Sequence, residues 1–420
     1  MKYLIIILIS FLIIGCGSSP KKYKYEKQID ETELNLFMQG KPDPYKPFFD
    51  VYLRQGARNS VLNEARIGLL AFNNGEYDLA GWLFDRAILK IETVYANNKT
   101  AKKARSKFTK EEVKDYKGDP YERAMVYLYR GLVYLQKDDY ENARASMLGG
   151  LLQDSLAEDK VYEQDFATLY YLAAWASQCN GNKSQSDDYY KQAIKYKPKL
   201  TKPNNKNNVL LIATSGISPV KKRQGKYNEQ MFFDVGSDLA SYKMASPDLT
   251  VKSKKINFVN SENLHWQATT RGGRTIDIIN EGKAVFKDKT EKTGDTFLKT
   301  GNALMNTSQY SNNKNIGNAG AVFALVGLFS KGISKASKPT ADIRYWDNLP
   351  SLIYLATGNK KTLKKGPLKF NFIDNVSKTI EDKSAEFNSI AISELESDKT
   401  CDLVTISNKS KFLTYRHINQ

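Results

Sequence analysis

One pattern of small and aromatic residues occurs twice in the first half of the chain, and it restricts the fold more than any other feature. The first copy runs from Gly68 to Ala87 and the second from Gly131 to Gly150. In both, a glycine is followed at the same offsets by a tyrosine, an alanine, a large apolar residue and a small residue. Small residues let two helices approach closely, so the pattern predicts pairs of packed helices. A third, weaker copy runs from Ala174 to Pro198.

The pattern resembles the tetratricopeptide repeat, whose 34-residue unit is a pair of antiparallel helices. The two clear copies lie 63 positions apart, from Tyr77 to Tyr140. The excess falls in Asn97–Asp119, which holds eight Lys or Arg and four acids. We interpret this segment as a solvated basic insertion, with a docking patch for an anionic partner as the alternative.

The hydrophobic period changes after 201–208, whose Pro, Lys and Asn are typical of a linker. The apolar run that follows, Val209 to Thr214, predicts a buried strand. We expect further strands at 250–259, 264–270, 275–279, 352–357, 367–373, 389–393, 403–407 and 412–416. The predicted fold class is therefore α+β: N-terminal tetratricopeptide-like helical repeats, followed by a β-rich domain.

The most apolar part of this second half is Ile316–Ser337, which contains four glycines. It predicts a glycine-containing apolar helix in the core of the β-rich domain. Insertion into a membrane or contact with a partner helix is the alternative, although about 15 apolar-rich residues are short for a membrane span.

The N-terminus predicts where the protein resides. A positive start and an apolar run end at Gly15-Cys16, which has the form of a lipoprotein signal peptide with Cys16 as the first mature residue. The thiolate of Cys16 would accept diacylglycerol, and several acyl chains including palmitate would anchor the protein to a membrane. Since Gly17 rather than Asp follows, the sorting logic of such proteins favours the outer membrane, on its periplasmic side.

The predicted organisation has five parts. They are a signal peptide at 1–15, a lipidated polar tether at 16–42, a helical domain at 43–200, a linker at 201–208 and a β-rich domain at 209–420.

The most distinctive string is Ala341-Asp-Ile-Arg-Tyr-Trp-Asp-Asn-Leu-Pro350. It resembles the Ala-Asp-x-Arg-x-Trp-x-x-Leu-Pro motif of an uncharacterised family of bacterial outer-membrane lipoproteins with tetratricopeptide repeats and a β-rich C-terminal half. Its motif residues here are Asp342, Arg344, Trp346 and Pro350. The segment 224–259 and the tail after Asn375 depart from the family. The resemblance implies a role in cell-envelope assembly or in regulating peptidoglycan synthesis.

The residue chemistry of the string is structural. Asp342 and Arg344 can form a charge-assisted pair within a turn. Trp346 can act as a packing anchor, and Leu349-Pro350 can start a strand, because the first residue of a strand need not donate. A catalytic Asp–Arg pair is the alternative.

The leading function is a non-enzymatic scaffold whose helical repeats bind another envelope protein. Helix positions that would face the groove are Tyr127, Arg130 and Tyr134; Trp82, in a second helix of a pair, is a groove or a core residue. Two alternatives remain: an enzyme that acts on peptidoglycan or a regulator of one, and a component of a surface secretion or motility apparatus.

Few residues suit metal or cofactor chemistry, since the chain has three Cys and two His. No metal site, cofactor or catalytic residue is predicted, and His265 and His417 are expected to be core or surface residues. Cys179 and Cys401 are expected to be free buried thiols, with a disulfide as the alternative. A net charge of +17 suits nucleic acid, but a lipid anchor argues against that partner; anionic lipid or peptidoglycan carboxylates fit better.

Overall fold

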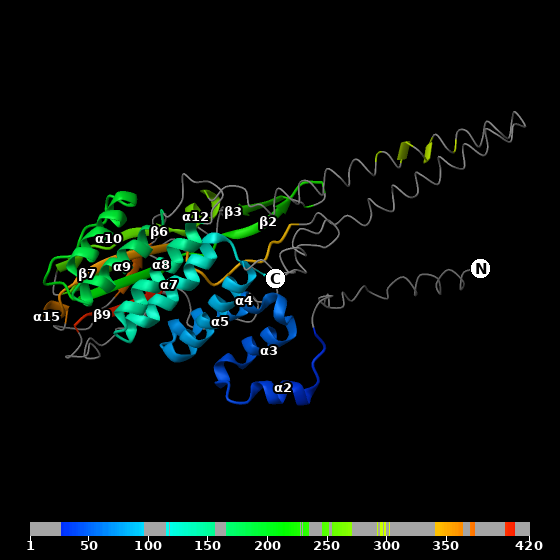
Figure 1. The fold of residues 1–420 in the computed structure, drawn as a ribbon, viewed down its shortest axis with the longest axis horizontal. Coiled ribbons are helices and arrows are strands. Elements are labelled where there is room, and N and C mark those ends of the chain that lie inside the picture. Colours follow the sequence, from blue (N-terminus) through cyan, green and yellow to red (C-terminus); the bar gives the residue numbers. More distant parts are fainter. Residues whose placement is uncertain are drawn as a thin grey trace, which may run out of the picture. The chain divides into compact units, whose positions relative to one another are not determined.

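The structure is a computed structural model (Figure 1). It describes residues 27–95, 115–116, 118–155, 165–226, 228, 230–234, 246–251, 254–270, 292, 295–296, 298–299, 302, 341–363, 370–373 and 400–407. They belong to two compact units, divided between Ala57 and Arg58, which are described separately. Cys16, most of the basic insertion, Ile316–Ser337, His417 and the strands expected at 275–279, 389–393 and 412–416 lie outside the described residues.

The first unit is helical. It contains α2 (Glu31–Met38), the short 3-10 helix η1 (Asp43–Tyr45) and α3 (Lys46–Gln55). Asp30 caps α2, because its carboxylate accepts a hydrogen bond from the backbone N–H of Glu33 at 2.7 Å. The ring of Phe37 stacks on that of Tyr52, with centroids 6.1 Å apart. The prediction of a polar tether over 16–42 was therefore wrong for 31–38, where a capped helix packs its aromatic side.

Six helices of the second unit form three consecutive pairs. They are α4 (Ser60–Asn73) with α5 (Tyr77–Tyr95), α7 (Pro120–Gln136) with α8 (Tyr140–Ser155), and α9 (Ala167–Cys179) with α10 (Lys183–Tyr196). Each pair is joined by a three-residue turn whose middle residue has a positive φ: Gly75, Asp138 or Gly181. The next residue donates its N–H to the carbonyl five residues back, at 2.9 to 3.0 Å. This backbone pattern ends a helix sharply, so the three pairs share one turn geometry.

Small residues allow the paired helices to approach, as the sequence predicted. A Cβ added to Gly68 would lie 2.8 Å from the Phe84 ring, and one added to Gly131 would lie 2.3 Å from Met147 Cε. The same offset in the third pair joins Ala174 to Tyr190, and both side chains are buried. The prediction of closely packed helix pairs is confirmed.

The main sheet has the strand order β6-β7-β1-β9 in the described chain. Its strands are β1 (Val209–Ser215), β6 (Val259–Asn263), β7 (Leu352–Gly358) and β9 (Asp402–Ser407). β1 pairs antiparallel with β7 and parallel with β9, which makes it a central strand. The strands predicted at 209–214, 352–357 and 403–407 are confirmed.

Both faces of β1 are buried, which explains its uninterrupted apolar sequence. Val209, Leu211 and Ala213 belong to a cluster with side chains of β7 and β9, whereas Leu210 and Ile212 alternate with them and are equally buried. Helix α9 contacts the sheet at β6, and α7 and α4 contact it at β9. The α+β class is confirmed for the described residues.

Shorter elements complete the second unit. They are β2 (Val220–Gln224), β3 (Gln230–Asp234), β4 (Ser246–Val251), β5 (Lys254–Ile256), α12 (Leu264–Thr270), α15 (Lys360–Leu363) and β8 (Phe370–Ile373). The 3-10 helix η2 (Ala57–Asn59) begins at the last residue of the first unit. The strand predicted at 264–270 is wrong, since these residues form α12. The Asn263 carboxamide oxygen accepts the N–H groups of His265 and Trp266 and caps the helix at its first turn.

The segment 201–208 does not separate two compact units, because residues 58–420 form one. Its end is hydrogen-bonded into the main sheet: the Asn208 N–H donates to Gly358 O at 3.0 Å, and Asn208 O accepts from the Asp402 N–H at 2.9 Å. Helices and sheet therefore belong together, whereas the sequence predicted a domain boundary here.

Candidate interaction surface

An exposed stripe runs along α5. Its members alternate between acidic and apolar residues: Asp78, Trp82, Asp85, Leu89 and Glu92. Their spacings of three and four residues keep them on one side of the helix. Trp82 and Leu89 are 46% and 62% exposed, unusually high for large apolar residues in a folded unit.

A second stripe, on α7 and the Lys137 that caps its C-terminus, faces the first. Lys137 pairs with Asp78, the Arg130 guanidinium donates two hydrogen bonds to Asp85 at 2.6 and 2.9 Å, and the Tyr127 hydroxyl donates to Glu92 at 2.8 Å. As residue numbers fall along α7 they rise along α5, so the helices run in opposite directions. We call this surface the α5–α7 seam. It comprises Asp78, Trp82, Asp85, Leu89, Glu92, Tyr127, Arg130, Tyr134 and Lys137.

Two aromatic rings of the seam are held by anchored arginines. The Arg86 guanidinium lies 4.9 Å from the centre of the Trp82 ring, and its Nε donates to the buried Glu64 carboxylate at 2.9 Å. The Arg130 guanidinium lies 3.6 Å from the centre of the Tyr134 ring, and Asp85 fixes it. Each ring thus has a cation on its face, and each cation has a carboxylate to orient it.

The four residues predicted to bind a partner lie together here. Trp82 is exposed and so not a core residue, which was one of its two interpretations. Tyr127 is buried, and its hydroxyl donates a hydrogen bond to Glu92. Burial is the main cause that raises the pKa of this hydroxyl, and the hydrogen bond to Glu92 raises it further. Arg130 and Tyr134 stack on each other at the edge of α7.

Glu64 was missed by the sequence reasoning. It is fully buried and accepts from both Arg86 and Lys90, the latter at 2.6 Å. The sequence does contain a signal for this residue. Glu64 is an acid inside the apolar run 61–72, and the next helix carries two basic residues, Arg86 and Lys90, one turn apart. A buried carboxylate needs such partners, because its desolvation is costly.

The string Ala341–Pro350 crosses onto the helices and is tied there by polar contacts. Arg344 donates to both carboxylate oxygens of Asp342 at 2.7 to 3.1 Å, and its Nη1 donates to the Asn59 side-chain oxygen at 2.7 Å. Burial alone would raise the pKa of the Asp342 carboxyl, but the charge and hydrogen bonds of Arg344 outweigh it and lower the pKa below 3.8. The predicted Asp342–Arg344 pair is present.

A buried charge cluster holds the same string from the other side. The Lys221 ammonium lies 2.8 Å from Asp119 and 3.2 Å from Glu122, and it donates to the Arg344 carbonyl at 2.9 Å. Glu122 also accepts the Trp346 N–H at 2.7 Å. These groups are almost entirely buried, and removing any one of them would leave a charge without its partner.

Trp346 lies between aromatic residues of two helices. Its ring centre is 6.5 Å from that of Phe84 on α5 and 6.1 Å from that of Tyr129 on α7. Only 1% of its surface is exposed. Pro350 is buried and lies two residues before β7, so the strand begins later than the predicted start at Leu349-Pro350. The geometry matches the interpretation of the string as a packing anchor.

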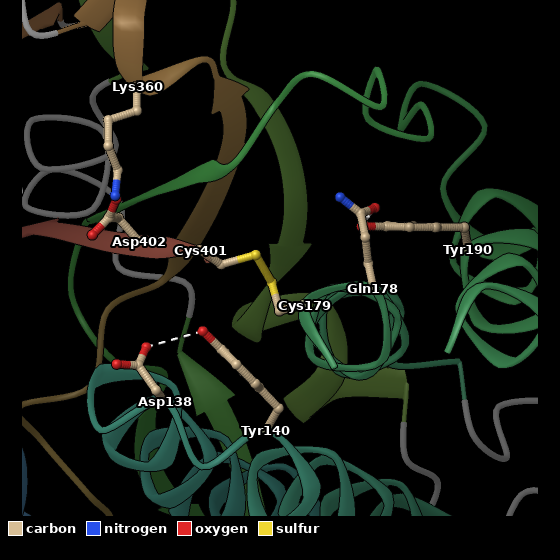
Figure 2. Close-up of a disulfide and its surroundings, with 8 residues drawn as sticks. All are labelled: Asp138, Tyr140, Gln178, Cys179, Tyr190, Lys360, Cys401 and Asp402. Carbon is tan, nitrogen blue, oxygen red and sulfur yellow. Dashed lines mark hydrogen bonds and ion pairs between the residues drawn. A yellow bond between two sulfur atoms is a disulfide. The ribbon is translucent and has the colours of Figure 1, made fainter. Parts of the chain in front are cut away.

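Cys179 and Cys401 form a disulfide, so the expectation of free thiols was wrong (Figure 2). The bond joins the last residue of α9 to the residue before β9, with Cα atoms 5.9 Å apart. The packing of α9 against the sheet brings together these two residues, which lie 222 positions apart in the sequence. Tyr140 lies beside the bond and its hydroxyl contacts Asp138 at 3.0 Å, while Lys360 pairs with Asp402.

One further buried carboxyl lies at the junction of β6 and α12. Glu262 accepts from Gln267 Nε2 at 3.0 Å and from the Asn263 N–H at 3.2 Å. Burial raises the pKa of Glu262 to about 7. His265 is buried nearby, and burial lowers its pKa.

Among the residues that the structure describes, no group of three or more His, Cys, Asp or Glu side chains has the arrangement of a metal site. No helix in the same residues is both long and apolar enough to cross a membrane. No family model matches the chain, and no curated protein or solved structure is significantly similar to it.

Proposed function

We propose that this chain is a lipid-anchored, non-enzymatic protein of the outer membrane, facing the periplasm, that binds another envelope protein through the α5–α7 seam. The observation that carries the proposal is the seam itself: exposed Trp82 and half-buried Tyr134 are held in place by anchored arginines. Trp, Tyr and Arg are the side chains that most often dominate binding energy at protein interfaces.

The helix pairs support the finer proposal that they are tetratricopeptide-like repeats. The corresponding turn residues Gly75, Asp138 and Gly181 precede Phe84, Met147 and Tyr190 by the same nine positions. Such repeats usually serve as scaffolds for other proteins. The departure is the long connection between the first two pairs.

The cysteines support the proposed location. Disulfides persist in oxidising compartments such as the periplasm and are rare in the cytosol. Since Cys179 bonds to Cys401, Cys16 is the third cysteine of the chain and stands at the predicted lipidation site. A diacylglycerol anchor on Cys16 and a disulfide in the folded part are both consistent with export of the chain to the periplasm.

Site-specific photocrosslinking tests the proposal. A photoreactive amino acid placed at Leu89 in cells that produce the protein should yield one discrete adduct with an envelope protein. The same group at Leu152, a 59% exposed leucine on α8, is the matched control and should not give that adduct. Identical adducts from both positions, or none from Leu89, would contradict the proposal. Cleavage of peptidoglycan by the purified protein would contradict its non-enzymatic part.

A further inference from the structure

The main sheet has an incomplete edge at the end of β7. On one side, β7 pairs with β1 along its whole length, as far as Gly358. On the other side, β6 pairs with β7 only as far as Leu355, which lies opposite Val259. In the described part of the chain, no strand continues β6 beside the last three residues of β7. These three residues therefore have a free edge.

The alternation of a strand decides which backbone groups point to this free edge. The Ile353 carbonyl oxygen faces β6, because it accepts from the Ser261 hydroxyl at 3.2 Å. The Gly358 carbonyl oxygen faces the other way, because it accepts from the N–H of Asn208, the residue before β1, at 3.0 Å. Backbone groups of successive residues in a strand point to opposite sides. The N–H and C=O of Thr357 therefore point to the β6 side, where a continued β6 would lie.

A cleft with a volume of about 340 Å³ lies at this free edge. It is lined by Leu355, Ala356 and Thr357 of β7 and by residues of α9, of the segment after α10 and of the chain just before β6, among them Tyr171, Leu200, Thr201, Ile256 and Asn257. Helix α9 contacts the sheet at β6, so one helix borders the cleft (Figure 1). The volume is at the lower end for ligand sites.

The cleft has apolar surface on both faces of the sheet. Ala356 belongs to the hydrophobic cluster on one face, and Ile256 packs against that cluster. Leu355 precedes Ala356 in the strand and so points to the opposite face. The helical side of the cleft adds Tyr171 and Leu200, both of which are buried. An extended chain in line with β6 would thus find apolar surface for side chains on either face.

We propose that this cleft binds an extended segment of a polypeptide, which adds to β7 as a short antiparallel strand in line with β6. Its central residue exchanges two backbone hydrogen bonds with Thr357, and the residues on either side direct their backbone groups away from β7. The three open residues of β7 span about 10 Å, so the paired segment is about three residues long. The cleft shares no residue with the α5–α7 seam, and this inference does not rest on the proposed function.

The backbone chemistry of the cleft argues for a peptide. Thr357 offers one donor and one acceptor on the same side, which is the pair that a single residue of an antiparallel strand completes. In recognition by strand addition, such main-chain bonds supply affinity, and pockets for alternate side chains supply specificity. Since the cleft is small and apolar on both faces, short apolar side chains fit it best.

A blocked tripeptide tests the inference. The probe is acetyl-Val-Ala-Val-amide, and its binding to the mature protein in nanodiscs of neutral lipid is measured by saturation-transfer NMR, with empty nanodiscs as the blank. Two comparison peptides carry a single N-methyl group, on the central alanine or on the C-terminal valine. The first lacks the N–H that donates to the Thr357 carbonyl, whereas the second lacks an N–H that points away from β7.

The unmodified peptide should bind saturably, with a Kd of about 1 mM or lower. N-methylation of the alanine should weaken binding at least tenfold, because it removes a hydrogen bond and places a methyl group against β7. N-methylation of the valine should weaken it less than threefold.

Two variants of one residue test the same contact from the side of the protein. Thr357→Pro should weaken binding at least tenfold, because it removes the N–H that faces the cleft; proline is tolerated where the N–H of a strand lies on an open edge. Thr357→Val retains this N–H and should bind like the parent.

The outcomes that overturn the inference are equally specific. No saturable binding up to about 10 mM, or equal losses for the two N-methylated peptides, would show that the free edge of β7 does not accept a strand. This comparison of peptides uses the unaltered protein, so it decides the question even if Thr357→Pro does not fold.

Discussion

Removing the Cys179–Cys401 disulfide should cost the protein a large share of its stability. The bond closes a loop of 222 positions. Constraining the unfolded chain over that length lowers its entropy by about 18 cal/mol/K, which corresponds to about 5 kcal/mol at 25 °C. Proteins of ordinary stability have about 5–15 kcal/mol in total. Reduction should therefore move the unfolding transition strongly.

The assay is equilibrium unfolding of the mature protein in urea, with and without a reductant. Reduction should lower the midpoint, and the dependence on urea should steepen because an unlinked unfolded chain exposes more surface. Cys179→Ser with Cys401→Ser is the control, since this double variant should behave like the reduced protein and ignore the reductant.

Local contacts determine how the native state responds. The parallel pairing of β9 with β1 and the Lys360–Asp402 ion pair do not involve the disulfide, so the folded structure should persist in water after reduction. A loss below about 1 kcal/mol on reduction would refute the reasoning, because it would mean that the bond hardly restricts the unfolded chain.

Three further predictions concern single residues. Trp346→Ala should cost about 3–5 kcal/mol in urea unfolding because it empties the space between α5 and α7; an unchanged midpoint would reject the anchor interpretation. The pKa of Glu262 is about 7 in the fold against 4.5 ordinarily, so its protonated form stabilises fully below about pH 4.5 and that contribution is lost as the pH rises through about 7. Glu262→Gln should flatten this dependence by up to about 3 kcal/mol between pH 4.5 and 8, measured by unfolding at each pH; a variant curve parallel to the parent would contradict it. Cys16→Ser should abolish incorporation of labelled palmitate, and labelling that persists would refute the lipidation prediction.

Local sequence patterns were sufficient to predict several helices and strands, but not how these elements pack together. Glycines at helical spacing predicted the contact of α4 with α5, and an apolar run predicted β1, because both signals come from neighbouring residues. The error at 264–270 came from β-favouring residues whose first turn is capped by Asn263. The cap is a local signal, and it favours a helix at this position.

Contacts between distant segments could not be predicted in the same way. The sequence suggested that Asp342 pairs with Arg344, but not that Lys221 and Glu122 would close around them. It placed Tyr127, Arg130 and Tyr134 on one helix face, but the acids that Tyr127 and Arg130 contact lie on another helix. Those acids determine what the candidate surface can bind, so its chemistry required the structure.

The position of Trp346 has a consequence for the order of folding. Its ring completes the packing between α5 and α7, yet it is synthesised long after both helices. Before Trp346 has been synthesised, Phe84 and Tyr129 lack this aromatic neighbour, so the helix pairs expose apolar surface. Contacts between residues so far apart in sequence form slowly, and partly folded chains of this kind aggregate readily. The nascent chain should therefore stay unfolded, and dependent on chaperones, until residues near 350 have emerged.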